Sequence, residues 1–313
     1  MPKFLLWEQD YGKGISRIVS HRRLQPKLVM LTPEQEKYIF SHAYIPEHIV
    51  GLITTVSGAE PFLVEDYFCC YKDDWLIVIG YPLDNNFVMG AFTRVLDKVK
   101  REFKPAHLSL IAPQLPESIE KDCQERESDQ YYTLVVREPS YKNSTKRNLM
   151  KAGELLRVEC ASKMGKAQQD LMQEFIRSRG LPARVVALIM KMPEYVASDK
   201  SAFVLNAWDA DDRLAAFYVV DVGARQFANY TIGCYSRENY VRGASDLLLA
   251  ELIRFARDHG KSYIHLGLGI NPGIRRFKEK WGGIAGLPYE MGELGLKRPS
   301  ILETFMTIMK KRN

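Results

Sequence analysis

The sequence of 313 residues is 46% hydrophobic and 26% charged, a balance that is typical of a folded globular chain and excludes a disordered or fibrous one. Its length exceeds what one compact core usually holds, so we expect two domains. The net charge of +6 favours phosphate-bearing partners such as a nucleotide cofactor or tRNA, but it is too small to require a nucleic-acid partner.

The first 130 residues are expected to form a mixed α/β unit. Thr32, followed by Pro33 and acidic residues, is typical of a helix start. Further patterns predict a second helix, a hairpin of two strands around the turn YKDD, a third helix and a short buried strand. These elements are expected at residues 31–40, 46–56, 60–82, 87–103 and 107–113. An acidic, polar stretch then closes the unit, and we place the domain boundary near residue 130.

From residue 131 onward the order of elements repeats. A strand, a basic helix, a strand, a helix and three antiparallel strands precede the strongest helix of the chain, which ends at Gly260, and a strand and a short helix follow. These patterns lie at residues 131–138, 140–159, 165–180, 201–236, 243–260, 262–269 and 271–283. The tail, SILETFMTIMKKRN, is amphipathic and basic. We therefore predict an α/β (α+β) protein with domains at residues 1–130 and 131–313, each a mixed, mostly antiparallel sheet flanked by helices.

Targeting and metal signals are missing from the sequence. No apolar run approaches the roughly 20 residues of a membrane span, and the N-terminus lacks the pattern of a secretory signal, so we expect no stable membrane insertion. The five cysteines show no Cys-x-x-Cys spacing, which predicts neither a disulfide framework nor a metal site. These features favour a cytoplasmic location.

The loop SRENYVRGAS, residues 236–245, lies between an expected strand and an expected helix. A helix start offers unpaired backbone N–H groups and a partial positive charge, which together suit a pyrophosphate. Gly243 and Ala244 would let a ligand approach the backbone closely, and Arg237 and Arg242 would add charged hydrogen bonds. The alternative is an ordinary helix start beside solvated arginines.

This succession of strand, loop, helix and strand resembles the core of the GCN5-related N-acetyltransferase (GNAT) superfamily, whose loop holds the coenzyme A pyrophosphate. The usual loop signature is Gln/Arg-x-x-Gly-x-Gly/Ala. The matching positions here are Tyr240, Gly243 and Ser245, of which only the glycine is kept. The resemblance implies that an acyl-CoA would bind at Arg237, Arg242, Gly243, Ala244 and Ser245.

The segment GIRRFKEKWGG, residues 273–283, carries five charges around one Phe and one Trp. Its Phe277–Lys278 pair before Gly282 resembles the C-terminal motif of the Fem-type aminoacyltransferases. These are tandem-GNAT proteins that move an amino acid from aminoacyl-tRNA onto an amino group of a cell-wall precursor. There the pair helps to bind the donor and stabilise the oxyanion, which implies catalytic roles for Phe277 and Lys278. The alternative is a solvated charged face anchored by Phe277 and Trp281.

A second fragment supports this resemblance. YKNSTKRNLMKAGEL, residues 141–155, is similar to the basic helix K-x-R-R-N-L-R-K-A that opens the second domain of Fem-like proteins. The resemblance covers residues 131–285, whereas the first 130 residues match only in their order of elements. The long coiled-coil hairpin of some Fem proteins, proposed to engage tRNA, has no counterpart in this sequence.

Residues on the substrate side are less clearly marked. Tyr230 and Tyr235 on an expected strand would line an acceptor groove, although strand tyrosines commonly serve packing. His265 lies on the strand face opposite Ile264 and Leu266, where it could shuttle protons near neutral pH or simply pack.

Three functions follow from these observations. The first is an N-acyltransferase that moves an acyl or aminoacyl group from acyl-CoA or aminoacyl-tRNA to a primary amine of a small molecule, peptide or lipid-linked precursor. The second is a non-catalytic GNAT-fold protein that binds a ligand or partner. The third is an RNA-binding protein that uses the basic segments at residues 142–151 and 275–280.

Overall fold

The computed structural model describes residues 31–136 and 143–296. Its helices are α1 (Pro33–His42), the 3-10 helix η2 (Pro46–His48), α2 (Val50–Ser57), α3 (Met89–Phe103), α4 (Glu117–Glu120), α5 (Asn143–Leu155), α6 (Lys166–Arg177), α7 (Ala183–Ser198), α8 (Ala244–Asp258) and α9 (Pro272–Lys280). Its strands are β1 (Glu60–Val64), β2 (Tyr67–Lys72), β3 (Trp75–Ile79), β4 (His107–Ala112), β5 (Glu125–Val135), β6 (Arg157–Ala161), β7 (Ala202–Trp208), β8 (Leu214–Asp221), β9 (Phe227–Tyr235), β10 (Tyr263–Leu268) and β11 (Ile284–Gly295).

All these strands form one sheet, in the order β1-β2-β3-β4-β11-β5-β10-β9-β8-β7-β6. Strands β3 and β4 are parallel, as are β9 and β10, and the other neighbours are antiparallel. The mixed, mostly antiparallel arrangement predicted from the sequence is therefore confirmed.

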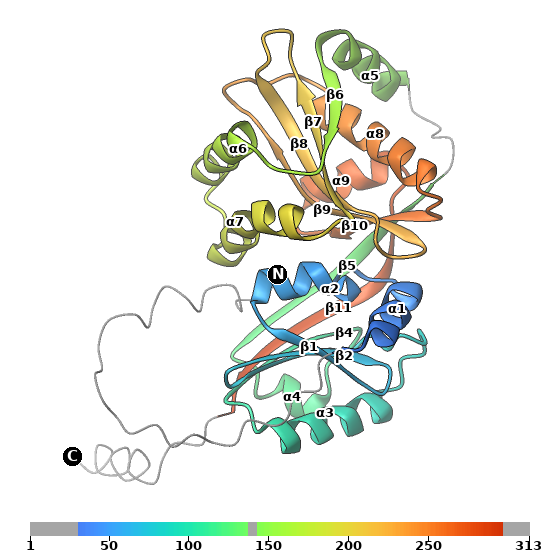
Figure 1. Ribbon diagram of the computed structural model, residues 1–313, viewed down its shortest axis with the longest axis vertical. Coiled ribbons are helices and arrows are strands. Elements are labelled where there is room, and N and C mark those ends of the chain that lie inside the picture. The colour runs from blue at the N-terminus through green and yellow to red at the C-terminus, as the bar shows by residue number, and fades with distance from the viewer. Residues whose placement is uncertain (1–30, 137–142, 297–313) are drawn as a thin grey trace, which may run out of the picture.

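The two long strands β5 and β11 join the halves of the molecule. They run side by side from the lower half, with α1 to α4, into the upper half, with α5 to α9 (Figure 1). Strand β11 also pairs with β4, and β5 also pairs with β10, so the last described strand of the chain completes the sheet of the first half. Residue 130 lies inside β5, and the division of the chain there stays a prediction.

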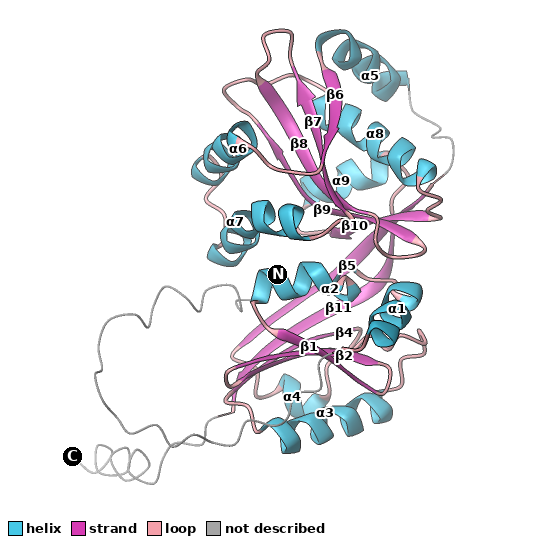
Figure 2. Ribbon diagram, in the orientation of Figure 1, coloured by secondary structure: helices cyan, strands magenta, loops and turns pink. Residues whose placement is uncertain are grey.

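The hydrophobic core is continuous between the halves. One cluster contains Ile39 and Tyr81 from the lower half together with Tyr195 and Phe217 from the upper half, and α2 contacts α7 across the junction. A second cluster lies under α8, and a third packs α3 against its strands (Figure 2). The junction is thus a packed interior in which buried side chains of both halves meet.

Several expected elements are confirmed and others were missed. The first helix begins as predicted, since the Thr32 hydroxyl accepts the Gln35 backbone N–H at 3.2 Å. Residues 60–82 form three strands instead of two, because Glu65, at φ 53°, makes an additional turn. Helix α7 and strand β11 were not predicted. Both contain proline within their bounds, which local pattern reading treats as a breaker.

Among residues 31–136 and 143–296 no helix is long and apolar enough to cross a membrane. The basic amphipathic tail at residues 300–313 lies outside the described residues.

Candidate active site

The site is built where two parallel strands separate. Strands β9 and β10 pair only between Phe227–Asn229 and Tyr263–His265, and beyond these three pairs they diverge. A bulge follows at Gly267, whose φ of 72° is a conformation that glycine adopts without strain. The bulge changes the face on which the strand continues, so that Leu268 joins the junction core while Leu266 packs under α8.

Helix α9 begins directly after this strand end. The Asn271 side chain accepts the Ile274 backbone N–H at 3.0 Å, and Pro272 fills the first helical position, which together fix the helix start. Phe277 and Trp281 pack with the cluster under α8, as the sequence predicted for an anchoring face.

Lys278, between these two anchors, is buried, with 4% of its surface exposed. Its Nζ donates to the Leu268 carbonyl at 2.6 Å and lies 5.5 Å from the ring centroid of Tyr132. Burial lowers the pKa of Lys278 to about 7, and the nearby Asp129 carboxylate opposes this shift. The Lys278 side chain therefore lies in the interior at the end of β10, where β9 and β10 diverge, and not on a solvated face.

Phe277 borders a cavity of about 230 Å³ at the start of α8. The predicted loop residues Gly243, Ala244 and Ser245 line it, together with Tyr240. The sequence-predicted Arg237 and Arg242 are exposed and do not line this cavity. The structure thus brings the backbone part of the predicted cofactor loop together and leaves its two arginines outside.

Helix α5 covers the loop glycine. Gly243 has a φ of 91°, and a Cβ at this position would lie 2.9 Å from the Asn148 carbonyl oxygen and 3.2 Å from the Ala152 methyl. The need for glycine is therefore explained by the close packing of α5 on the start of α8. Close approach of a ligand is not needed to account for it.

Two carboxylates, those of Glu174 and Asp246, accept hydrogen bonds from donor groups around this cavity. Glu174 on α6 accepts the Ser236 hydroxyl at 2.8 Å and the Arg237 backbone N–H at 2.6 Å. Asp246, 7% exposed, accepts the Trp281 indole N–H at 2.8 Å and the Lys280 ammonium at 2.5 Å. The Ser236 hydroxyl and the Arg237 N–H are thus already bonded to Glu174, whereas the charge of Asp246 is balanced by Lys280.

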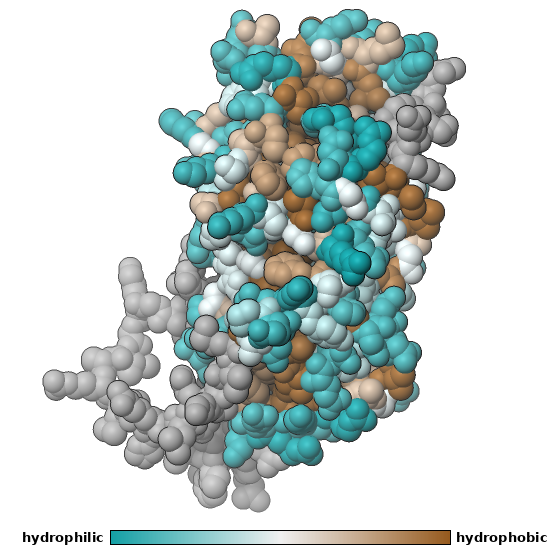
Figure 3. Space-filling model, turned by 45° about the vertical axis from the view of Figure 1, so that its right-hand side comes forward, coloured by the Kyte–Doolittle hydropathy of each residue, from teal (hydrophilic) through white to brown (hydrophobic). Residues whose placement is uncertain are grey.

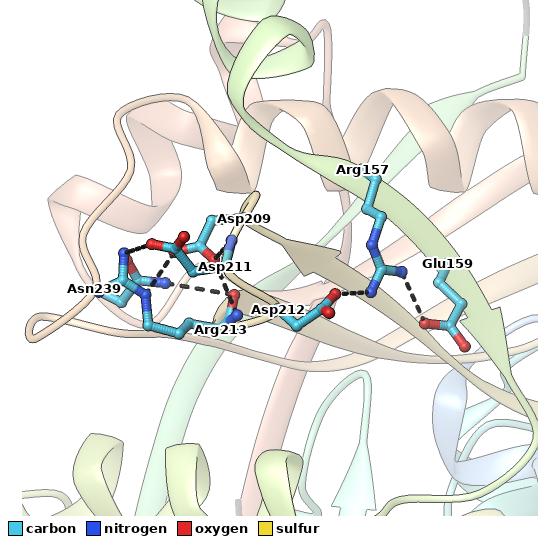
Figure 4. A network of polar contacts seen from close by, with 7 residues as sticks. All are labelled: Arg157, Glu159, Asp209, Asp211, Asp212, Arg213 and Asn239. Carbon is cyan, nitrogen blue, oxygen red and sulfur yellow. Dashed lines mark hydrogen bonds and ion pairs between the residues drawn. The ribbon is translucent and has the colours of Figure 1, made fainter.

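A polar network fixes the far side of the loop. Asp209 accepts the backbone N–H groups of Asp211 and Arg213, and Asn239 of the loop donates to the Arg213 carbonyl at 3.4 Å (Figure 4). These carboxylates serve a turn and form no metal centre. Among residues 31–136 and 143–296, no group of three His, Cys, Asp or Glu side chains could hold a metal ion.

The three residues expected on the substrate side lie apart. Tyr235 lines the cavity, and the Arg179 guanidinium covers its ring at 4.1 Å. Tyr230 does not line the cavity and packs against Tyr218, with 4.7 Å between ring centroids. His265 is fully buried in the junction core, on the face opposite Ile264 and Leu266 as predicted.

Sequence reasoning missed Glu174 and the α5 contact because no local pattern links residues 148, 174 and 243. It also missed Glu47 and Tyr131, which are buried and hydrogen-bonded to each other at the junction. The one available signal was the Pro-Glu-His triplet at residues 46–48, an acid and an imidazole inside an otherwise apolar stretch.

No protein-family model and no curated protein sequence matches the chain. Solved structures do match. The C-terminal domain of a putative lysylphosphatidylglycerol synthetase from Agrobacterium fabrum is similar with a TM-score of 0.59 and 13% identity, over 89% of this chain and 95% of that one. FemX gives a TM-score of 0.60 and 9% identity, over 84% and 96%. L-PGS from Bacillus licheniformis gives 0.54 and 12%, over 89% and 96%.

These matches span nearly the whole of each neighbour, so the likeness concerns both halves and their arrangement. The chain has the tandem GNAT-like fold of the Fem type, which confirms the resemblance drawn from its motifs. Identities of 9–13% establish the fold alone.

Proposed function

We propose that this protein is an N-acyltransferase that moves an aminoacyl group from aminoacyl-tRNA to a primary amine. The observation that carries the proposal is Lys278, a buried lysine with a lowered pKa at the separation of β9 and β10. Perturbed ionisable groups of this kind concentrate at active sites. The name of one structural neighbour, a putative lysylphosphatidylglycerol synthetase, specifies an aminoacylated lipid as product, which agrees with an aminoacyl donor.

In the proposed reaction the acceptor amine attacks the carbonyl carbon of the aminoacyl ester directly. A C–N bond forms, the C–O bond to the tRNA ribose breaks, and the amine proton passes to the departing ribose oxygen, which leaves as a hydroxyl group. Lys278 in its charged form stabilises the negative charge that develops on the carbonyl oxygen, while its bond to the Leu268 carbonyl orients it. Burial raises the pKa of the Cys70 and Cys234 thiols, which disfavours a covalent route through these cysteines.

The choice of tRNA over coenzyme A rests on the α8 loop and on α5. Glu174 already occupies the Ser236 hydroxyl and the Arg237 N–H of the loop, and α5 covers Gly243. Helix α5 in turn exposes Lys146, Arg147 and Lys151. The face of the molecule drawn in Figure 3 mixes hydrophilic and hydrophobic side chains. An exposed basic helix beside the cavity suits a polyanionic donor.

The second candidate is a GNAT-fold protein that binds a ligand without turnover. Its support is the same loop, because its donors are bonded to the chain's own carboxylates. Under this alternative, Lys278 serves only to satisfy the Leu268 carbonyl.

A transfer assay separates the two candidates. Wild type is incubated with labelled aminoacyl-tRNA or acetyl-CoA and a panel of primary amines, beside Lys278→Ala and the control Lys166→Ala, which removes an exposed lysine of α6. We expect transfer from aminoacyl-tRNA only, with a loss of about 100-fold or more in Lys278→Ala and no change in Lys166→Ala. Binding of a donor without transfer by wild type would favour the second candidate.

A further inference from the structure

A buried polar cluster lies at the junction of the two halves, close to Lys278 but outside the α8 cavity. Its centre is Tyr131 on β5, whose hydroxyl donates to the Glu47 carboxylate at 2.6 Å. The Tyr131 ring centroid lies 4.9 Å from that of His265 and 5.3 Å from that of Tyr289. His48, next to Glu47 on η2, completes the cluster. Four segments far apart in the sequence therefore meet here.

Three polar atoms of this cluster have no hydrogen-bond partner among the described residues. His265 Nδ1 accepts the Gly267 backbone N–H at 3.2 Å, which places the ring proton on Nε2, and this donor is unpartnered. His48 Nε2 donates to the Tyr81 carbonyl at 2.9 Å, which leaves Nδ1 as an unpartnered acceptor. The Tyr289 hydroxyl is the third. His48, His265 and Tyr289 are each at most 1% exposed.

Such atoms are costly unless another molecule satisfies them. A buried polar group without a partner costs about 1–3 kcal/mol, and native interiors contain few of them. The charged form of Glu47 is also unfavourable in this position. Burial raises the pKa of its carboxyl, and no Lys or Arg among residues 31–136 and 143–296 forms an ion pair with it. A cation bound beside Glu47 would relieve this cost.

The chemistry of the cluster selects the cation. Glu47, the His48 Nδ1 atom and the Tyr289 hydroxyl supply three acceptors, which matches the three donors of a primary ammonium group. The rings of Tyr81 and Tyr289 pack edge-on against the ring of Tyr131, whose hydroxyl bonds to the carboxylate, and aromatic surface of this kind attracts cations. His265 Nε2–H supplies one donor, suited to a carbonyl oxygen next to the ammonium group.

His265 does not compete with a bound cation. Burial, with help from the charge of Lys278, lowers its pKa to about 3, so the ring is neutral across the physiological range. Lys278 bonds to the carbonyl of Leu268, which ends the strand that carries His265, so the cluster lies near the proposed catalytic group.

We propose that this junction cluster binds the primary ammonium group of a substrate, with Glu47 as its counter-ion. This inference rests on the proposed function, because both substrates of the proposed transfer carry a primary ammonium group. One is the α-amino group of the aminoacyl donor, which has a carbonyl oxygen beside it. The other is the acceptor amine before it loses its proton.

Binding of small amines tests the inference without any transfer reaction. The full-length protein is titrated by calorimetry with alaninamide, which carries an α-ammonium group and a carbonyl, with ethylamine, which is a bare amine, and with uncharged N-acetylalaninamide. We expect saturable binding of a charged probe in the millimolar range and none of N-acetylalaninamide. Preference for alaninamide would assign the site to the donor, and equal binding of ethylamine would assign it to the acceptor.

Variants locate the binding. Glu47→Gln should weaken the charged probe about tenfold or more, as expected for loss of a buried charged contact, whereas Glu36→Gln, at an exposed position of α1, should change nothing. Tyr289→Phe removes only the unpartnered hydroxyl and should weaken binding severalfold, which keeps the test decisive if Glu47→Gln fails to fold. No binding by wild type at about 10 mM, or equal affinity in wild type and Tyr289→Phe, would overturn the proposal.

The outcome also separates this inference from the proposed function. Lys278→Ala should abolish transfer and leave amine binding in place. Transfer by wild type that is unaffected in Glu47→Gln would refute the ammonium site alone. Amine binding through Glu47 without transfer from any donor would instead refute the acyltransferase and retain the site.

Discussion

The loop at the start of α8 and the cluster at the junction differ in how their polar atoms are satisfied. At the loop, Glu174 accepts the Ser236 hydroxyl and the Arg237 backbone N–H. At the junction, the imidazoles of His48 and His265 each have one atom without a hydrogen-bond partner among the described residues. The difference teaches that donors within a recognisable motif can be bonded by the chain itself, while the proposed ammonium site is indicated by polar groups that the described residues do not satisfy.

The largest expected effect concerns Lys278 and pH. Its pKa is about 7 in the folded protein and near 10.5 when unfolded, so between these values the unfolded chain binds more protons. The unfolding free energy should therefore rise with pH, by at most about 1.4 kcal/mol per unit. Urea unfolding of wild type and Lys278→Met at pH 7, 8 and 9 measures it. The rise should vanish in Lys278→Met and persist in Lys166→Met, and parallel curves would contradict the buried placement.

Gly243→Ala tests whether α5 presses on the loop. The new methyl would meet the Asn148 carbonyl at a positive φ, so we expect a loss of about 2–3 kcal/mol. Gly260→Ala at the other end of α8 is the matched control, because its φ of 66° is also positive but nothing lies within 4 Å of the added atom. Chemical denaturation measures the unfolding free energy of both variants. The loss in Gly260→Ala reports the strain of a positive φ, and any additional loss in Gly243→Ala reports crowding by α5. Equal losses would mean that α5 leaves the loop open to a ligand.

Glu174→Ala removes the carboxylate that bonds the loop. We expect the unfolding free energy to fall by about 1–3 kcal/mol, because the Ser236 hydroxyl and the Arg237 N–H lose their acceptor. Calorimetry should still detect no coenzyme A binding, since α5 continues to cover Gly243. Millimolar affinity for coenzyme A in this variant would show that Glu174 alone excludes the cofactor, and the loop would then count as a ligand site held closed.

The smallest effect concerns the exposed face of α5. Lys146→Ala should weaken binding of aminoacyl-tRNA modestly and reduce the slope of log affinity against log salt by about 0.7–0.9. Stability should change by no more than about 0.5 kcal/mol. Filter binding at several salt concentrations measures the slope. Lys98→Ala on α3, in the other half of the molecule (Figure 1), should leave the slope unchanged, and an equal effect of both variants would argue against docking at α5.

Much of the upper half could be predicted from local patterns. The hydrophobic face of α8 and its glycine end, and the proline start of α9, are signals within single segments, and the structure has both helices close to the predicted bounds. Lys278 was singled out by a motif of the same kind. The failures were β11 and α7, whose prolines and glycines conceal elements that tertiary pairing nevertheless stabilises.

The burial of Lys278 could not be predicted. Its neighbours in sequence are charged, which left a solvated face as the alternative, and only the contact with the Leu268 carbonyl places it in the interior. The same holds for Tyr230 and Tyr235. Both lie on β9, but the packing around each strand face decides that only Tyr235 borders the cavity.

The sequence by itself determined the fold class, the order of most elements and the family resemblance, because helix periodicity, caps and short motifs depend on residues near one another in the chain. Only the tertiary structure decided that β11 completes the sheet of the first half and that α5 covers Gly243. It alone brought Glu47 to Tyr131, 84 residues away. Such contacts arise from the pairing of distant strands and the shared core between the halves, and no local pattern encodes them.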